Sequence, residues 1–324
     1  MTENLYSVTN CINQELNDFE QRIESCFSKE SSLLRTMIDY WFAKKGKRIR
    51  PALTLLTSCM LGKPSESTYK GSLILELIHT ASLIHDDVLD QSHLRRGQST
   101  INNLWGNNAA ILLGDYLYGK CMEFVVTQED FALVPIYSHI ATSLPKGELL
   151  QKSVAENGSY DEKDYFDIIY YKTATLLEAA CEIGVKTCGN TKSLQRMKDA
   201  GKYIGIAFQI KDDILDFQLD NNSDKPRGND LKEKKITLPT IFYLQQLKEN
   251  ERHAALAFIL SNEKTDNDLH TFIQKVHLSR SIQKAQEVAE DYSRQALDLV
   301  MREQENEYRN QLLQLIKYLT NRQF

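Results

Sequence analysis

Six aspartates in two short repeats are the residues of this chain best placed to do chemistry. The pentapeptides Asp86-Asp87-Val88-Leu89-Asp90 and Asp212-Asp213-Ile214-Leu215-Asp216 share the form D-D-x-x-D, and both lie in apolar sequence. Buried charge without compensation costs several kcal/mol per ion, so two such clusters predict a strongly cationic partner between them. Carboxylate oxygens select hard cations, and Mg²⁺ commonly joins one or two carboxylates to substrate phosphates. The repeats therefore predict divalent metal ions.

Helices would let each repeat aim its carboxylates in one direction. Residues three, four and seven positions apart share a helix face, so the segment 73–90 places His79, Asp86 and Asp90 on one stripe with Asp87 at its edge. A single repeat would also fit a solvated acidic helix end, but a second copy in apolar sequence argues against that alternative. The second segment presents a corresponding stripe of Gln209, Asp212, Asp213 and Asp216.

The elements that position these stripes are predicted to be long helices. The chain has only 14 Gly and 6 Pro, and neither residue follows Pro239. Both residues disfavour helix interiors, and apolar residues recur at helical spacing, as at Leu73, Leu77 and Ala81. The sequence therefore predicts an all-α fold with a single domain over residues 1–324. Helices should break near residues 43–51, 62–67, 91–108, 128–135, 157–164, 188–193, 220–238 and 261–268.

Composition excludes several classes of function. The 324 residues are 42% hydrophobic and 26% charged, and 39 basic against 44 acidic residues give a net charge of -5. This balance gives no footprint for nucleic acid. The six cysteines form no C-x-x-C pair, and the N-terminus has no apolar leader, which predicts a cytoplasmic protein with reduced thiols. No apolar run reaches the roughly 18 residues of a membrane span, so integral membrane association is not expected.

Short basic clusters supply the cations that an anionic ligand of bound metal would need. Residues 44–50 hold five Lys and Arg residues around Gly46, just before Pro51. Proline fits the first turn of a helix, so this cluster is predicted at a helix N-terminus, which favours anions. Each cluster alone fits a solvated surface better, but their order along the chain predicts diphosphates held between metal and cations. The other clusters are Arg95-Arg96-Gly97, Lys172-Thr173, Lys225–Asp230 and Lys234-Lys235.

Taken together, these motifs resemble the trans-isoprenyl diphosphate synthases, or polyprenyl synthetases, over residues 45–240. The resemblance rests on the segments 46–51, 86–97, 172–173, 209–216 and 225–239. It implies an all-α helical bundle around a deep central cavity. It also implies a head-to-tail condensation, in which an allylic diphosphate ionises to a carbocation and isopentenyl diphosphate attacks it. Metal ions and fixed cations would stabilise the departing diphosphate, and an apolar cavity would exclude water.

The resemblance also implies a role for each matching residue. Three Mg²⁺ ions per active site are expected, two of them on Asp86 and Asp90 with Asp87 in support, and one on Asp212 with help from Asp213 and Asp216. Thr173 would stabilise the carbocation with its dipole, and Lys235 would close the diphosphate site. The allylic diphosphate would be held by Arg95, Lys172, Gln209 and Lys225, and isopentenyl diphosphate by Lys47, Arg50, His79 and Arg96.

Product length should depend on how far the growing tail extends beneath the first acidic helix end. Five residues before Asp86, at about 1.5 Å per residue, lies Ala81, with Ser82 beside it. Members of this family that stop early resemble one another in placing a bulky aromatic there. Two small residues therefore predict a product of hexaprenyl length or longer, unless a residue lower down such as Ile78 closes the shaft earlier.

Several alternatives remain open at this point. A farnesyl or geranylgeranyl diphosphate synthase would use the same motifs. So would a catalytic or regulatory subunit of a two-component synthase with a small partner, although non-catalytic subunits usually lose an aspartate or the Arg pair. A class I terpene cyclase would lack the second repeat and the basic loop at residues 46–51. The resemblance alone implies a homodimer, and peripheral membrane contact for product release stays open.

Overall fold

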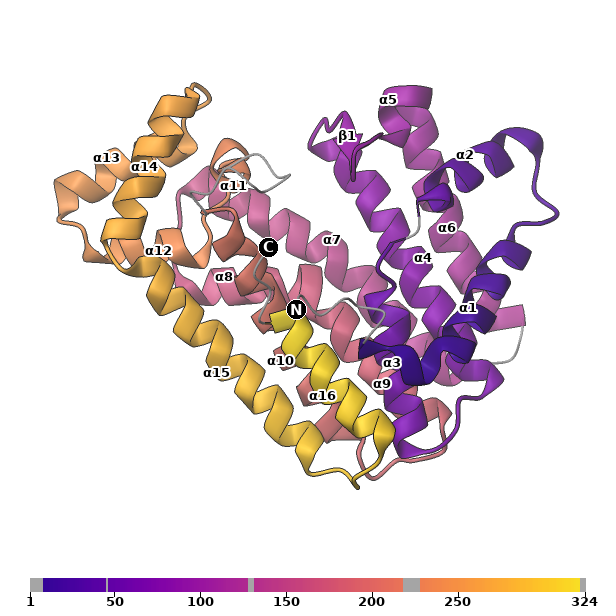
Figure 1. The fold of residues 1–324 in the computed structure, drawn as a ribbon. Helices are drawn as coiled ribbons and strands as arrows, with labels where there is room; N and C mark the ends of the chain where they lie inside the picture. Colours follow the sequence, from indigo (N-terminus) through magenta and orange to yellow (C-terminus); the bar gives the residue numbers. More distant parts are fainter. Residues whose placement is uncertain (1–7, 45, 128–130, 218–227, 321–324) are drawn as a thin grey trace. The chain divides into compact units, whose positions relative to one another are not determined.

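The structure, a computed structural model, is all-α in the part it describes, which confirms the predicted fold class (Figure 1). It describes residues 8–44, 46–127, 131–217 and 228–320. Among these residues, the one exception to helix and loop is a small antiparallel hairpin formed by strands β1 (Leu94–Arg95) and β2 (Gln98–Ser99). No helix in the described residues is long and apolar enough to cross a membrane.

The chain divides into two compact units, each considered separately below. The first comprises residues up to Thr142, Leu176–Gly201 and Val300–Leu315. The second comprises Ser143–Thr175, Lys202–Leu299 and the residues from Ile316 on. The boundaries fall inside helices rather than in linkers. The single domain over residues 1–324 and its deep central cavity stay predictions.

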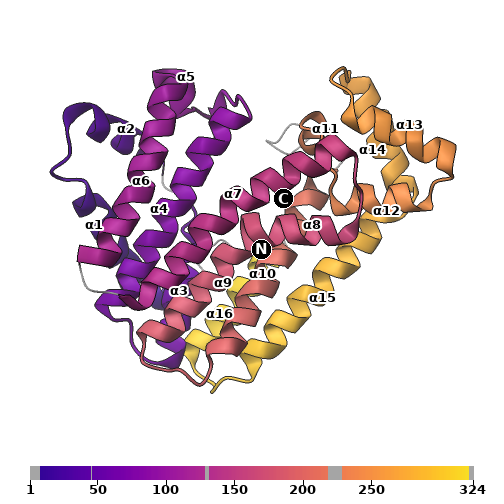
Figure 2. The same ribbon diagram turned by 180° about the vertical axis from the view of Figure 1, so that it is seen from behind.

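In the first unit, helix α4 packs most extensively against α6, and the two lie side by side in both ribbon views (Figures 1 and 2). Helix α4 starts at a capping box in which Ser65 and Thr68 exchange side-chain to backbone hydrogen bonds. Most of its residues up to Ile84 are buried, which holds the first acidic repeat on a firm support. The unit contains α1 (Asn13–Cys26), α2 (Ser32–Ala43), α3 (Ile49–Leu61), α4 (Glu66–Leu89), α5 (Ile101–Trp105), α6 (Asn107–Thr127) and nearly all of α9 (Thr175–Thr187), with parts of α7 (Val134–Asn157) and α10 (Leu194–Leu215), the end of α15 (Ser281–Met301) and most of α16 (Glu307–Thr320).

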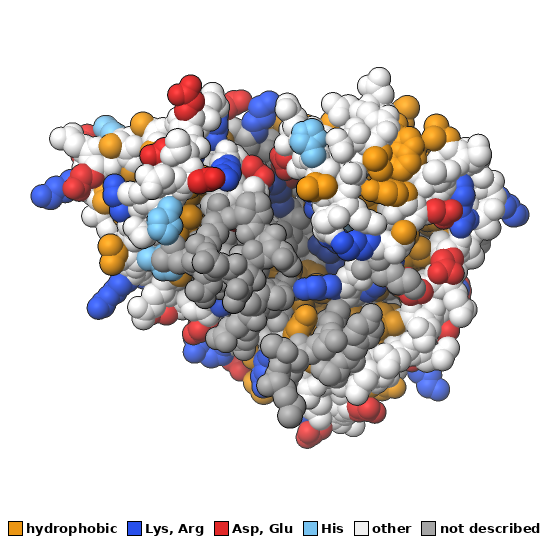
Figure 3. Space-filling model, turned by 45° about the horizontal axis from the view of Figure 1, so that its top comes forward, with side chains coloured by type: hydrophobic (Ala, Val, Ile, Leu, Met, Phe, Trp, Pro, Cys, Tyr) orange, Lys and Arg blue, Asp and Glu red, His pale blue; other side chains and the backbone are white. Residues whose placement is uncertain are grey.

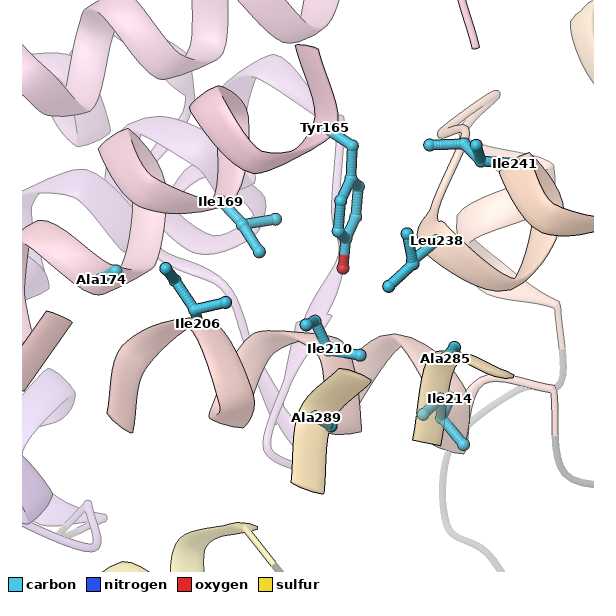
Figure 4. Close-up of a cluster of buried hydrophobic side chains, with 10 residues drawn as sticks. All are labelled: Tyr165, Ile169, Ala174, Ile206, Ile210, Ile214, Leu238, Ile241, Ala285 and Ala289. Carbon is cyan, nitrogen blue, oxygen red and sulfur yellow. The ribbon is translucent and has the colours of Figure 1, made fainter. Parts of the chain in front are cut away.

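In the second unit, α8, α10, α12 and α15 surround a cluster of buried hydrophobic side chains (Figure 4). Ile206, Ile210 and Ile214 recur every four residues along α10 and face this cluster. A π-helical turn, Tyr170–Ala174, follows α8 directly. The unit contains α8 (Glu162–Ile169), α11 (Asn229–Lys232), α12 (Leu238–Gln246), α13 (Glu249–Leu260) and α14 (Asp266–Leu278), with most of α7 (Val134–Asn157), α10 (Leu194–Leu215) and α15 (Ser281–Met301) and the end of α16 (Glu307–Thr320).

The predicted helix breaks near residues 43–51, 62–67, 157–164, 188–193 and 261–268 are confirmed. The sequence did not predict that Pro145 would lie inside α7. It also did not predict the hairpin within 91–108, or the helix ends near residues 247–248, 279–280 and 302–306, which use neither Gly nor Pro. At the predicted break near 261–268, Thr265 and Asp268 form a capping box at the start of α14. The predicted breaks at 128–135 and 220–238 lie partly outside the described residues.

Candidate active site

Both D-D-x-x-D repeats lie at the C-terminal ends of helices. Helix α4 ends at Leu89 with Asp90 as its C-cap, and α10 ends at Leu215 directly before Asp216. A helix C-terminus carries a partial negative charge equivalent to about half an elementary charge, which repels carboxylates. The helix ends therefore add to the negative charge of the aspartates. Each repeat needs compensation by cations, as a metal-binding role would predict.

Within the first repeat, Asp87 is fixed by the protein itself. Its side chain is 2% exposed and accepts hydrogen bonds from Arg95 Nε at 2.8 and 2.9 Å, while Arg95 Nη2 lies 2.8 Å from Oδ1. Burial raises the pKa of Asp87, and Arg95 opposes that rise. Asp86 is half-buried and Asp90 is exposed. The expected role of Arg95 on the allylic diphosphate stays a prediction, because here its guanidinium is on Asp87.

The hairpin places Arg96 beside the basic loop. Arg96 and Gly97 form the two-residue turn between β1 and β2, with φ of 52° and 72°. Tight hairpins of this length favour positive φ, which is uncommon for a residue with a side chain. The Arg96 guanidinium lies so close to Gly46 that an added Cβ there would be 2.9 Å from Nη1. Strained backbone of this kind concentrates at functional sites.

Arg50, Arg96 and His79 form the core of a candidate anion site in the first unit. Burial lowers the pKa of Arg50 to about 10, with a further contribution from Arg96, and the buried Nε of Arg50 makes no hydrogen bond. Burial lowers the pKa of His79 well below its ordinary value, and the neighbouring arginines act in the same direction. The site therefore combines two guanidinium groups with a neutral imidazole, all able to donate hydrogen bonds to phosphate oxygens.

Arg48 belongs to the same basic loop, and its side chain anchors the loop to two glutamates. Its Nε lies 2.7 Å from Glu20 and its Nη1 lies 2.6 Å from Glu76, with the Arg48 side chain 11% exposed. Arg48 is also the N-cap of α3 in the left-handed conformation, with φ of 50°. Lys47, next to it, is exposed. The loop is therefore held by carboxylates of α1 and α4, which no sequence motif indicated.

Within the second repeat, Asp213 is buried and takes two neutral partners. Tyr165 Oη donates to Asp213 Oδ2 at 2.6 Å, and Gln209 Nε2 donates to Oδ1 at 2.8 Å. Burial raises the pKa of Asp213 to about 7. Thr173 Oγ1 donates to the other end of the Gln209 amide at 2.6 Å. The preceding residue, Asp212, is half-buried.

Asp216 is hydrogen-bonded to the start of α11. Its carboxylate accepts hydrogen bonds from the backbone N–H groups of Asn229 and Asp230, at 3.1 and 2.9 Å. Burial raises the pKa of Asp230 well above its ordinary value, and Asp213 and Asp216 raise it further. Lys235 forms an ion pair with Glu233. Lys225, a predicted diphosphate ligand, lies outside the described residues.

Lys172 and Thr173 project from the π-helical turn Tyr170–Ala174. Lys172 Nζ lies 2.5 Å from Glu148 and 3.0 Å from Gln151 Oε1, both on α7. Gly147 makes this approach possible, since an added Cβ would lie 2.7 Å from Lys172 Cγ. Short π-helical segments occur often at functional sites. This one carries the Lys172-Thr173 motif that the sequence analysis singled out.

The residues expected to set product length lie on α4. Ala81 is fully buried, and Ser82 is half-buried with its hydroxyl donating to His79 O at 2.9 Å. His85 Nε2 lies 3.1 Å from the carbonyl oxygen of Ile111 on α6, so this end of α4 is fastened to α6. The role of Ala81 and Ser82 in chain length stays a prediction.

Sequence reasoning missed the partners that hold the predicted ligands. These partners have no motif of their own, but helical spacing offers a signal for some. Glu76 lies three residues before His79, and Glu148 and Gln151 are three apart on α7, so each pair shares a helix face. Tyr165 and Asp230 had no such signal. The missed residues are Glu20, Glu76, Glu148, Gln151, Tyr165, Asp230 and Glu233.

The donor set fits a hard divalent cation. Both helix ends offer carboxylate oxygens, which suit Mg²⁺ or Ca²⁺ and not softer metals. Within the described residues, no three His, Cys, Asp or Glu side chains converge closely enough to hold a metal alone. Mg²⁺ usually keeps several waters and is held by one or two carboxylates plus substrate phosphates. Elsewhere, acidic and basic side chains are interspersed on the face that Figure 3 draws.

Comparisons with known proteins identify similar chains over nearly the whole length. The profile of the polyprenyl synthetase family matches residues 31–276. Solanesyl-diphosphate synthase 2 of Oryza sativa is 33% identical over 96% of this chain and 78% of its own. The decaprenyl diphosphate synthase of Rhodobacter capsulatus superposes with a TM-score of 0.92 at 28% identity, covering 98% and 99%. A polyprenyl synthase of Caulobacter crescentus, complexed with calcium and isoprenyl diphosphate, gives 0.91 at 26% identity, covering 99% of each chain.

Proposed function

This chain belongs to the polyprenyl synthetase family, and from that premise we propose that it is a long-chain trans-polyprenyl diphosphate synthase. Its substrates would be isopentenyl diphosphate and an allylic diphosphate. The observation that carries the proposal is the candidate anion site, where the half-buried Arg50 and His79 and the exposed Arg96 present hydrogen-bond donors in the unit that holds the first acidic repeat. A buried guanidinium Nε without a hydrogen bond, as in Arg50, is expected to take an anionic acceptor.

The metal ions are proposed to be Mg²⁺, three in each active site. Asp86 and Asp90 would hold two of them, and Asp212 the third. Asp87 and Asp213 would act in support, since both are buried and hydrogen-bonded to protein partners. Asp216 would contribute while its carboxylate also orders Asn229 and Asp230. When bound, Mg²⁺ would stabilise the charge on the departing diphosphate.

The remaining residues would bind and orient the two substrates. Thr173 would turn its oxygen toward the carbocation. Lys172 is presented by the π-helical turn, and its contacts with Glu148 and Gln151 restrain it in place. We propose Lys47, Arg50, His79 and Arg96 as ligands of isopentenyl diphosphate, and Arg95, Lys172, Gln209, Lys225 and Lys235 as ligands of the allylic diphosphate.

Small residues at Ala81 and Ser82 support a long product. Neither side chain would block a hydrocarbon tail that extends along α4 from the first repeat. Solanesyl and decaprenyl synthases are among the similar proteins. We therefore expect a product of hexaprenyl length or longer. Chromatography of the dephosphorylated products would test this, and farnesol or geranylgeraniol as the end point would contradict it.

The direct test is prenyl transfer by the purified chain. The protein would be incubated with Mg²⁺, isopentenyl diphosphate and labelled farnesyl diphosphate. Asp86→Ala and Asp212→Ala should each lower kcat by at least about 100-fold, the scale of removing one group that stabilises transition-state charge. Asp298→Ala is a matched control, because Asp298 is exposed on α15. Near-normal activity in both site variants would overturn the assignment.

The same assay addresses a requirement for a partner subunit. A two-component synthase would show no turnover with the purified chain alone, and turnover after cell lysate is added. Turnover by the homogeneous protein would favour a synthase that acts alone, and recovery only with lysate would favour a two-component synthase.

We also propose a homodimer that covers the outer face of α6. Ile111, Leu112, Met122 and Val126 are exposed there, Leu112 by 67%, and Gly119 on the same face has open space around it. Several exposed apolar side chains on one helix face, here with the exposed Asp115 among them, are typical of a protein interface. Analytical ultracentrifugation should give a dimer, and Met122→Glu should shift it toward monomer. A monomeric wild-type protein would contradict the proposal.

A further inference from the structure

A chain of hydrogen bonds in the second unit links a buried tyrosine to the residue proposed to face the carbocation. Tyr165 donates to Asp213, Gln209 donates to the other oxygen of Asp213, and Thr173 donates to the Gln209 carbonyl. The three distances are 2.6, 2.8 and 2.6 Å. The four residues come from α8, α10 and the π-helical turn. Three short contacts in series make a connected polar network in a largely buried setting.

Tyr165 is the fixed end of this chain. It is 4% exposed and stands within the hydrophobic cluster of the second unit. Figure 4 shows its ring extending from α8 between Ile169 and Leu238, with the hydroxyl at the end nearer α10. Packing on the ring therefore holds the phenol in one orientation, and its hydroxyl must donate to Asp213 to be satisfied.

The donor and acceptor roles at Asp213 determine which way the Thr173–Gln209 hydrogen bond runs. A carboxylate accepts hydrogen bonds and has none to give. With Tyr165 on one oxygen of Asp213, the other oxygen requires a donor from Gln209, which is the amide NH₂ group. The amide oxygen then points at Thr173, so the Thr173 hydroxyl donates its hydrogen bond to Gln209. The Thr173 oxygen keeps only lone pairs for any other partner.

The backbone at Thr173 is also held closely. Gly205 on α10 packs against the π-helical turn, where an added Cβ would lie 2.4 Å from the Cα of Ala174. The turn and α10 are therefore in direct backbone contact beside the Thr173–Gln209 hydrogen bond. Rotation of the Thr173 hydroxyl is restrained by this geometry together with the amide.

We propose that Tyr165 is a positioning residue for prenyl transfer, acting through Asp213 and Gln209 to aim the lone pairs of Thr173 at the allylic carbocation. This inference rests on the proposed function. A hydroxyl oxygen stabilises positive charge when its lone pairs face the charge, and an opposed O–H dipole would destabilise it. Without the Tyr165 hydroxyl, the Asp213 carboxylate loses one of the two hydrogen bonds that hold its orientation, so the Gln209 amide and the Thr173 hydroxyl are held less firmly in the aligned geometry.

Tyr165→Phe tests the proposal because phenylalanine keeps the ring in the hydrophobic cluster. We expect kcat to fall about tenfold, equivalent to about 1.4 kcal/mol in the barrier, while KM for both substrates stays within twofold. The half-saturating Mg²⁺ concentration should also stay within twofold. Tyr292→Phe is a matched control, because Tyr292 borders the same cluster from α15 and should keep wild-type kcat.

A double-mutant cycle separates positioning from general loss of structure. If Tyr165 acts through Thr173, the double variant Tyr165→Phe/Thr173→Val should have the same kcat as Thr173→Val alone. Multiplied effects in the double variant would overturn the proposal. A large shift in the Mg²⁺ requirement of Tyr165→Phe would also overturn it, since that would place the effect on the metal-binding aspartates.

The side-chain amide of Gln209 gives a readout that does not depend on turnover. With ¹⁵N-glutamine labelling, the Gln209 amide protons should exchange slowly in the wild type and in Tyr292→Phe, and quickly in Tyr165→Phe. Fast exchange in the wild type would overturn the chain itself. An inactive wild type with a protected amide would overturn the proposed function alone, and unchanged kcat in an active Tyr165→Phe variant would overturn the positioning role alone.

Discussion

Glu76 offers a test of the candidate anion site that separates its stability from its affinity. This carboxylate on α4 is 8% exposed and pairs with Arg48 at 2.6 Å. It also opposes the lowering of the pKa of Arg50 and of Arg96. Glu76 therefore offsets part of the positive charge of the guanidinium groups that are proposed to bind an anion. Glu76→Gln keeps the size of the side chain and removes its charge.

The structure predicts opposite effects of Glu76→Gln on folding and on binding. Breaking a buried ion pair typically costs 3–5 kcal/mol, and we expect about 3 kcal/mol because Arg48 keeps its contact with Glu20. Binding of isopentenyl diphosphate should become tighter. A unit charge roughly 10 Å from a ligand contributes about 1.7 kcal/mol at an effective dielectric constant of about 20. After screening, we expect a gain of about tenfold in affinity.

Urea unfolding and calorimetric titration measure the two effects. Isopentenyl diphosphate alone is suitable for the titration, because no condensation occurs without the allylic substrate. Glu20→Gln is the matched control. Glu20 pairs with the same Arg48 at 2.7 Å, with 18% of its side chain exposed, whereas Glu76 is the carboxylate that raises the pKa of Arg50 and of Arg96. It should reduce stability and leave affinity unchanged. Equal changes in affinity for both variants, or weaker binding by Glu76→Gln, would refute the reasoning.

Three further predictions concern other parts of the two units. Ala81→Phe should shorten the product, because an aromatic ring would block a tail extending along α4. An unchanged product length on chromatography would contradict the proposal that the tail passes Ala81. Gly114→Ala should cost about 1–3 kcal/mol in unfolding free energy, because its Cβ would lie 2.1 Å from His85 Nε2, and adding His85→Ala should restore part of that loss. Burial raises the pKa of Asp213 to about 7, so the folded state binds more protons than the unfolded state from about pH 4 to pH 7. Its contribution to stability therefore falls as pH rises through this window, and Asp213→Asn should flatten the decline in urea unfolding measured with EDTA.

Much of the fold followed from the sequence because helix periodicity and helix breakers act locally. The small number of Gly and Pro residues predicted long helices, and Gly62 and Pro51 marked real ends. The hairpin around Arg96 did not follow, because a non-glycine residue at positive φ opposes the local preference. Tertiary contacts, such as that of the Arg96 guanidinium with Gly46, accompany this conformation. Contacts between residues that are distant in the sequence cannot be inferred from local sequence patterns.

The sequence named the candidate ligands, which stay predictions, but not the residues that hold them in place. Acidic and basic motifs are visible because the same chemistry repeats at fixed spacing. The groups that restrain them, such as Glu76, Glu148 and Tyr165, come from distant positions and look like ordinary helix residues. Their role depends on burial, which makes each charge or hydroxyl require a specific partner. Burial is a property of the packed structure, so single-sequence reasoning could not assign these residues.

In the two D-D-x-x-D repeats, the first and second aspartates have the same contrasting environments. In each, the second aspartate is buried and fixed by the protein, Asp87 by Arg95 and Asp213 by Tyr165 and Gln209. The first aspartate is half-buried in both. Helix geometry turns neighbouring residues about 100° apart, so anchoring the second carboxylate inward leaves the first aimed differently. The anchors differ in charge, however, because Arg95 pairs with Asp87, whereas Asp213 hydrogen-bonds to a phenol and an amide and Lys235 acts on it only through its charge. We therefore expect the second repeat to depend more strongly on a bound cation than the first.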